Sequence, residues 1–91
     1  MIKGKTASGF EFCVNKNVMD DIEVVDAIAG IGSDDIYEKT SGFSMLCKKL
    51  LGKEKKRLYD HVRTKDGRVP PAELEKELLE IFNAFGEQGK N

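Results

Sequence analysis

The sequence predicts a mainly α-helical domain: a compact bundle of about four helices with a small β-hairpin at its N-terminus. Apolar residues recur with helical spacing over most of the chain after residue 20, whereas the first fifteen residues alternate apolar and polar side chains around a short turn. A chain of 91 residues has room for one modest hydrophobic core. We therefore expect one domain over 1–91, divided into a hairpin (1–15), a helical part (20–86) and a loose tail (87–91).

The N-terminal segment is expected to form two strands. Phe10, Phe12 and Val14 are separated by single residues, which is the period-two pattern of a strand with one buried face. Residues 7–9 (Ala-Ser-Gly) supply the turn that follows a first strand over 2–6. Because an isolated hairpin is only marginally stable in water, it must pack against the helices.

Two helices are predicted between residues 20 and 51, and acidic residues precede each of them. The first follows Asp20 and Asp21 and ends at the Gly-Ile-Gly of 30–32. Its predicted core face comprises Ile22, Val25, Ile28 and Ala29. The second is capped by 33–35 and runs to Leu51, with a predicted apolar stripe of Ile36, Phe43, Cys47 and Leu50 and with Leu46 beside it. Thr40-Ser41-Gly42 are poor helix formers, so both a continuous helix and a break there are compatible with the sequence.

The second half of the chain predicts a short helix, a turn and a long helix. The short helix spans 53–63 and has a narrow apolar stripe of Leu58 and Val62. Residues 64–68 form a turn because they contain Asp-Gly. The long helix begins at 70–71 (Pro-Pro) and is expected to end at Gly86. Its periodic apolar residues, which we assign to the core, are Leu74, Leu78, Ile81, Phe82 and Phe85.

The chain has few residues that could carry catalysis or bind a metal. His61 is the only histidine, and we expect it to be a packed or solvent-edge side chain. Cys13 and Cys47 lack metal-site spacing, so we expect two buried or half-buried thiols and no disulfide. The acid pairs 20–21 and 34–35 lack the ligand series of a calcium loop. We therefore expect no enzyme, with no catalytic residue, no cofactor and no metal.

Nothing in the sequence indicates a membrane segment. The longest apolar runs have two or three residues, against the roughly 20 that a transmembrane helix needs. The first five residues also lack the apolar region of a signal peptide. We therefore expect a cytoplasmic protein without membrane contact.

The near-neutral net charge of −1 is the sum of three blocks of opposite sign. Residues 1–47 have eight acids and four bases (−4), residues 48–68 have three and nine (+6), and residues 69–91 have five and two (−3). We take the middle block as a candidate interaction surface. Its selected residues are Lys48, Lys49, Lys53, Lys55, Lys56, Arg57, Arg63 and Arg68.

Two interpretations of this basic block are open. It can pair with acidic faces of its own chain or of a partner, including head-to-tail self-association into a ring or filament. Alternatively, the chain is a small nucleic-acid-binding regulator that uses residues 48–68. Acidic blocks on both sides would repel phosphate, and Tyr59 is the only aromatic residue in the stretch. We therefore favour protein contacts and expect no nucleic acid.

A family resemblance covers most of the chain. The segment 50–70, LLGKEKKRLYDHVRTKDGRVP, resembles small proteins encoded among the tail genes of tailed phages and prophages of Gram-positive bacteria, which are assigned as tail assembly chaperones. The resemblance extends to 8–12 (SGFEF), to 21–27 (DIEVVDA) and to the ending 77–91.

This resemblance implies a mostly α-helical, non-enzymatic protein that acts in the host cytoplasm and is absent from the mature virion. Chaperones of this family are thought to coat the long tape measure protein, which keeps its hydrophobic helices in solution, and to recruit tail tube protein. Many are made in a short and a frameshift-extended form, and this chain would match the short one. The family provides no catalytic motif that could be transferred to this chain.

Overall fold

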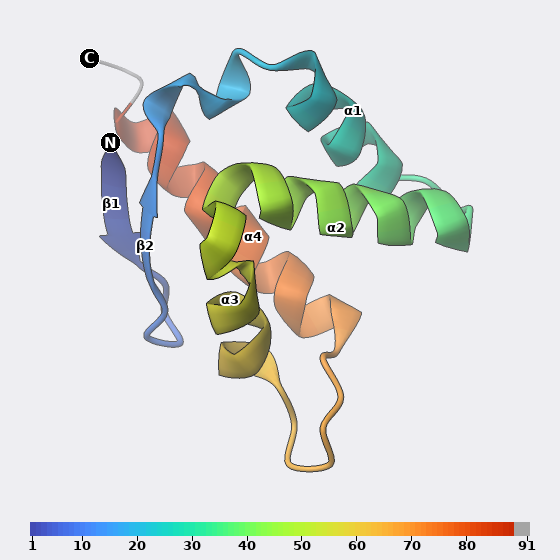
Figure 1. Ribbon diagram of the computed structural model, residues 1–91. Helices are drawn as coiled ribbons and strands as arrows, with labels where there is room; N and C mark the ends of the chain where they lie inside the picture. Colours follow the sequence, from blue (N-terminus) through green and yellow to red (C-terminus); the bar gives the residue numbers. More distant parts are fainter. Residues whose placement is uncertain (89–91) are drawn as a thin grey trace.

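A computed structural model of the chain describes residues 1–88 and is mainly helical, with an antiparallel β-hairpin at the N-terminus (Figure 1). Both features confirm the prediction. The strands and helices are β1 (Ile2–Lys5), β2 (Glu11–Val14), α1 (Ile22–Ile31), α2 (Ile36–Leu51), α3 (Lys55–Val62) and α4 (Pro71–Gln88). Short 3-10 turns over Lys16–Met19 and Gly52–Glu54 precede α1 and α3.

The predicted bundle of about four helices needs correction. Three helices, α1, α2 and α4, have ten residues or more, whereas α3 has eight. The third helix is short because its sequence supplies little apolar surface, and Leu58 is its one buried residue. α1 and α2 pack side by side, whereas α4 passes behind α2 in Figure 1.

The hairpin has the predicted alternation. Ile2 pairs with Val14 across the antiparallel ladder, and Phe10, Phe12 and Val14 are buried while the residues between them are exposed. β1 contacts α4 and β2 contacts α2. The hairpin therefore obtains from the helices the packing that two strands alone lack.

One hydrophobic core joins the hairpin to all the helices. In α4, the predicted core residues Leu74, Leu78 and Ile81 are buried, and Phe82 and Phe85 are partly buried against the core. The largest fully buried side chains of the whole core are Phe10, Leu46, Leu58, Ile81, Val14, Val24 and Cys47.

The predicted core face of α1 is wrong. The buried residues are Val24 and Ala27, whereas the face that we assigned to the core lies in solvent. Its members are Ile22 (70% exposed), Val25 (46% exposed), Ile28 (38% exposed) and the exposed Ala29. The sequence IEVVDAIAGI has apolar residues around most of the helix, so its periodicity fits two faces equally well. The structure buries the face with the small side chains, which allows α1 to lie close to α2.

Gly42 is the residue of α2 that makes this close approach possible. α2 is continuous through Thr40-Ser41-Gly42, and Gly42 is buried against α1. A Cβ atom at this position would lie 2.6 Å from the carbonyl oxygen of Ala27 and 2.9 Å from the amide nitrogen of Ile31. Gly30 has the same role on α1, since its Cβ would lie 2.9 Å from the carbonyl oxygen of Glu38.

The ends of the helices agree with the predicted capping residues except at the end of α4, and one predicted stripe residue of α2 is exposed. Asp21 and Asp35 cap α1 and α2 by accepting backbone N–H bonds two residues further on. Ile36, which was predicted in the core stripe, is 71% exposed because the buried part of α2 begins at Gly42. α4 continues past Gly86 to Gln88, since glycine lowers helix propensity without excluding helical backbone angles. Of the predicted tail, residues 89–91 lie outside the described residues.

Candidate interaction surfaces

The predicted basic surface follows the end of α2, the 3-10 turn, α3 and the loop after it. Lys49 points toward the start of α1, where its Nζ atom lies 3.0 Å from Asp21 Oδ2 and 2.6 Å from Glu23 Oε1. Lys49 holds the pKa of Asp21 below its usual value, and hydrogen bonds to Glu23 and Asp21 raise the pKa of Lys49. Lys49 therefore joins α1 to α2.

Most of the other basic residues also have acidic partners within the chain. These ion pairs are Lys56–Asp60 (2.6 Å), Arg57–Glu54 (2.8 Å), Arg63–Asp60 (3.2 Å) and Arg68–Asp66 (2.9 Å). Hydrogen bonds from Lys56 and Arg63 lower the pKa of Asp60. Such exposed pairs contribute little to stability, but they reduce the positive charge that the surface offers to a ligand.

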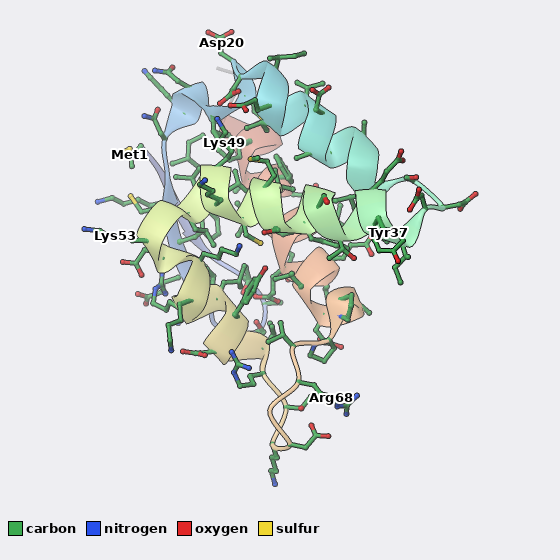
Figure 2. The ribbon with its side chains drawn as sticks, turned by 45° about the vertical axis from the view of Figure 1, so that its right-hand side comes forward. Met1, Asp20, Tyr37, Lys49, Lys53 and Arg68 are labelled. Carbon is green, nitrogen blue, oxygen red and sulfur yellow. The ribbon has the colours of Figure 1, made fainter. Side chains whose placement is uncertain are left out.

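Two of the basic side chains hold neighbouring elements. Arg57 donates to the carbonyl oxygen of Glu11 at 2.7 Å and lies 4.3 Å from the centre of the Phe10 ring, which attaches α3 to the hairpin. Lys55 donates to Ser44 Oγ at 2.9 Å. Within residues 1–88, Lys48 and Lys53 are exposed and have no ion pair or hydrogen bond. Figure 2 shows Lys53 at the outer edge of the molecule and Tyr37 at the opposite end of α2.

A second surface, which the sequence did not predict, lies on α1. We call Ile22, Val25 and Ile28 the α1 apolar face, because these exposed side chains recur every three residues along α1. Eight large apolar side chains are exposed within the described part of the chain, and this face contains three of them. Single exposed apolar residues are normal on proteins, whereas a continuous group indicates a contact site.

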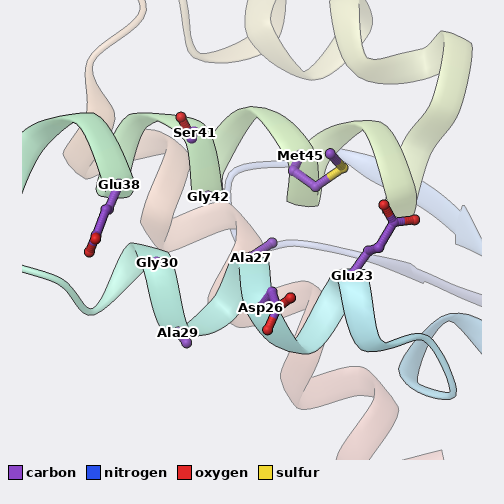
Figure 3. A pocket seen from close by; sticks show the side chains of 9 residues that line it. All are labelled: Glu23, Asp26, Ala27, Ala29, Gly30, Glu38, Ser41, Gly42 and Met45. Atoms are coloured by element: carbon purple, nitrogen blue, oxygen red, sulfur yellow. The ribbon is translucent and has the colours of Figure 1, made fainter.

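A groove of about 500 Å³ runs between α1 and α2 (Figure 3), and its lining does not include the residues of the α1 apolar face. Small residues line its middle, namely Ala27, Gly30 and Gly42, with Met45 above them on α2. Carboxylates stand at both ends and in the middle of the groove, because Glu38 and Glu23 lie at opposite ends and Asp26 between them. The groove is therefore partly apolar and rimmed by acids.

Sequence reasoning also missed a buried carboxylate below the hairpin turn. Glu77 is 2% exposed and accepts hydrogen bonds from Thr6 Oγ1 (2.7 Å) and Ser8 Oγ (2.8 Å). One available signal was its spacing, since Glu77 lies three residues after Leu74 and four before Ile81 and so shares their face of α4. The three side chains attach the hairpin to α4.

Ser8 Oγ also lies 2.9 Å from His61 Nε2, an arrangement that resembles a nucleophile beside its base. A hydroxyl has one proton, and the proton of Ser8 goes to Glu77. The His61 ring must then donate its own N–H to Ser8, so it does not act as a base toward that hydroxyl. His61 is exposed and packs against the ring of Phe10. Within residues 1–88, no group of three or more His, Cys, Asp or Glu side chains is arranged to hold a metal ion.

The two cysteines are free thiols in different environments. Cys47 is buried as predicted, and burial raises the pKa of its thiol to about 11. Cys13 is exposed, which corrects the prediction of a buried or half-buried thiol, because it lies on the outward face of β2. We expect iodoacetamide at about pH 8 to modify Cys13 rapidly and Cys47 only after unfolding, since the thiolate is the reactive form. Mass spectrometry would show one modification per folded chain, and rapid modification of Cys47 would contradict its placement in the core.

Comparisons with known proteins found no relative from which a function could be transferred to this chain. No protein-family model, curated protein or solved structure matches the chain. No helix within the described part of the chain is long and apolar enough to span a membrane.

Proposed function

We propose that this chain is a non-enzymatic phage tail assembly chaperone that acts in the host cytoplasm, binds the tape measure protein and helps to recruit the tail tube protein. The observation that supports a protein-binding role best is the exposed α1 apolar face, on a helix that also lines an acid-rimmed groove. Proteins use such surfaces to receive an amphipathic helix of a partner. The resemblance over 8–12, 21–27, 50–70 and 77–91 suggests which partners these are.

The basic block supports this proposal better than the alternative, a nucleic-acid-binding regulator. A phosphate backbone is held by uncompensated lysine and arginine side chains. Here Lys49, Lys56, Arg57, Arg63 and Arg68 have carboxylate partners of their own. Every acid that pairs with this block reduces the attraction for phosphate.

We therefore expect no binding of duplex DNA, even at about 50 mM salt, where phosphate contacts are strongest. Fluorescence anisotropy of a labelled duplex, titrated with the protein at low and high salt, measures this directly. Binding at low salt that weakens with added salt, and that Lys48→Ala or Lys53→Ala reduces, would favour the regulator. Lys76→Ala, on the exposed side of α4, serves as the matched control variant.

Coexpression with the tape measure protein tests the proposed function. The client is the long coiled-coil protein that a tail gene cluster would encode downstream of this chain, with the tail tube gene upstream. We expect the chaperone to keep this client in the supernatant and to co-purify with it. An unrelated acidic helical protein of similar size is the control. A client that stays insoluble with both proteins would contradict the proposal.

A further inference from the structure

We propose that the α1 apolar face and the adjoining groove form the docking site for a basic amphipathic helix, meaning a helix with one apolar stripe flanked by lysine or arginine. This inference rests on the proposed function, because it specifies the chemistry of the client segment that the chaperone holds. The arrangement of apolar, small and acidic residues around α1 carries it.

The apolar face has the dimensions of a helix-binding strip. Ile22, Val25 and Ile28 lie at intervals of three residues on α1. The ten residues of α1 span about 15 Å, which is close to three turns of a partner helix. Val24 and Ala27 are the buried residues of α1, whereas Ile22, Val25 and Ile28 are 70%, 46% and 38% exposed.

The groove between α1 and α2 offers a docked helix a recess for one side chain. Its middle is hollow because Gly30 and Gly42 have no side chains, and α1 and α2 meet there with their backbones. Met45 forms an apolar wall on α2 (Figure 3). Leucine or methionine from a docked helix can therefore enter between the two helices while its neighbours cover Val25 and Ile22.

The charge around the site selects the partner. Residues 20–38 contain seven acids and no basic residue, the acids being Asp20, Asp21, Glu23, Asp26, Asp34, Asp35 and Glu38. Lys49 is shared between Asp21 and Glu23. Among the described residues, Asp26 has no partner, and Glu38 accepts only from the Ser33 hydroxyl.

This negative field decides between possible occupants. Two copies that paired through the same α1 face would bring their acids together, and like charges facing each other in an interface oppose association. Phosphate groups of nucleic acid or anionic lipid would be repelled in the same way. A helix with lysine or arginine beside its apolar stripe instead gains favourable charge contacts along both edges of the groove.

Fluorescence anisotropy with synthetic peptides tests the site. The probe is a labelled peptide of about 14 residues with a leucine stripe flanked by lysines. One comparison peptide has glutamate in place of lysine, and another has the same residues as the probe in an order without a stripe. We expect the probe to bind at least about tenfold more tightly than either comparison peptide.

Two substitutions locate the binding to α1. Val25→Ser should weaken binding of the probe peptide by about tenfold, since it removes one apolar contact. Leu79→Ser, at an exposed apolar residue of α4, should leave binding unchanged. Asp26→Lys should weaken the lysine probe, whereas Glu73→Lys at an exposed site of α4 should have little effect.

The other outcomes overturn either this inference or the proposed function, and they distinguish the two. If the peptide without a stripe binds as tightly as the probe, the interaction depends on net charge alone and the apolar face is not the docking site. A dimer without peptide, seen by sedimentation and dispersed by Val25→Ser, would assign the face to a second copy. If wild type and Val25→Ser hold the tape measure protein in solution equally well, the proposed function stands and this site fails. If the probe binds as expected but the tape measure protein stays insoluble, the site stands and the proposed function fails.

Discussion

Gly42→Ala is expected to destabilise the protein by about 2 kcal/mol, although alanine is the better helix former by about 1 kcal/mol. The added Cβ would lie 2.6 Å from the carbonyl oxygen of Ala27 and 2.9 Å from the amide nitrogen of Ile31. Both are backbone atoms, so no side-chain rotation relieves the contact. α1 must move away from α2, which loosens the packing around Val24. Urea unfolding followed by circular dichroism measures the change.

Thr40→Ala is the matched control for this substitution, because Thr40 is exposed in the same helix. It makes the same kind of gain in helix propensity without a new contact, and we expect stability within about 0.5 kcal/mol of wild type. A Gly42→Ala variant as stable as Thr40→Ala would contradict the close approach of α1 and α2, and with it the groove between them.

Glu77→Ala is expected to cost about 3 kcal/mol. The carboxylate is 2% exposed and accepts from the hydroxyls of Thr6 and Ser8. Its removal leaves these donors without their acceptor at the place where the hairpin meets α4, and hydrogen bonds to charged groups contribute about 1.5–3 kcal/mol each. Glu77→Gln retains an acceptor oxygen and should lie between wild type and Glu77→Ala.

Urea unfolding and hydrogen exchange of the β1 amides test this prediction together. In Glu77→Ala the β1 amides should exchange faster than in wild type, because the hairpin loses its attachment to α4. Glu73→Ala, at an exposed site one turn earlier in α4, should change stability by less than about 0.5 kcal/mol. Equal effects of the two substitutions would mean that Glu77 does not hold the hairpin.

Local signals explain why so much of the fold follows from the sequence. The hairpin, the caps at Asp21 and Asp35 and the core stripe of α4 each depend on residues within a few positions of one another. The buried face of α1 depends instead on Gly42, which contacts Ala27 from another helix. The burial of Glu77 depends on Thr6, which is 71 residues away in the chain. Neither contact can be predicted from the apolar periodicity of a single helix, because each depends on a residue in another element.

For the basic surface, too, the sequence predicted the local feature and missed the contacts between side chains. Summing charges over 48–68 correctly found the most basic segment. The sum did not account for the ion pairs within it, although Arg57–Glu54 and Lys56–Asp60 have the helical spacings at which such pairs form. The α1 apolar face could not be found in this way, because a stripe of Ile22, Val25 and Ile28 predicts core in most helices.

The central claim is that the α1 apolar face is the surface that holds a client helix. Site-specific photocrosslinking in the complex with the tape measure protein tests it most directly, with a benzophenone side chain placed at position 25 on α1 or at position 53 in the basic surface. We expect a crosslink to the tape measure protein from position 25 and none from position 53. A crosslink from position 53 alone, or no crosslink from position 25 in a complex that still co-purifies, would contradict the claim.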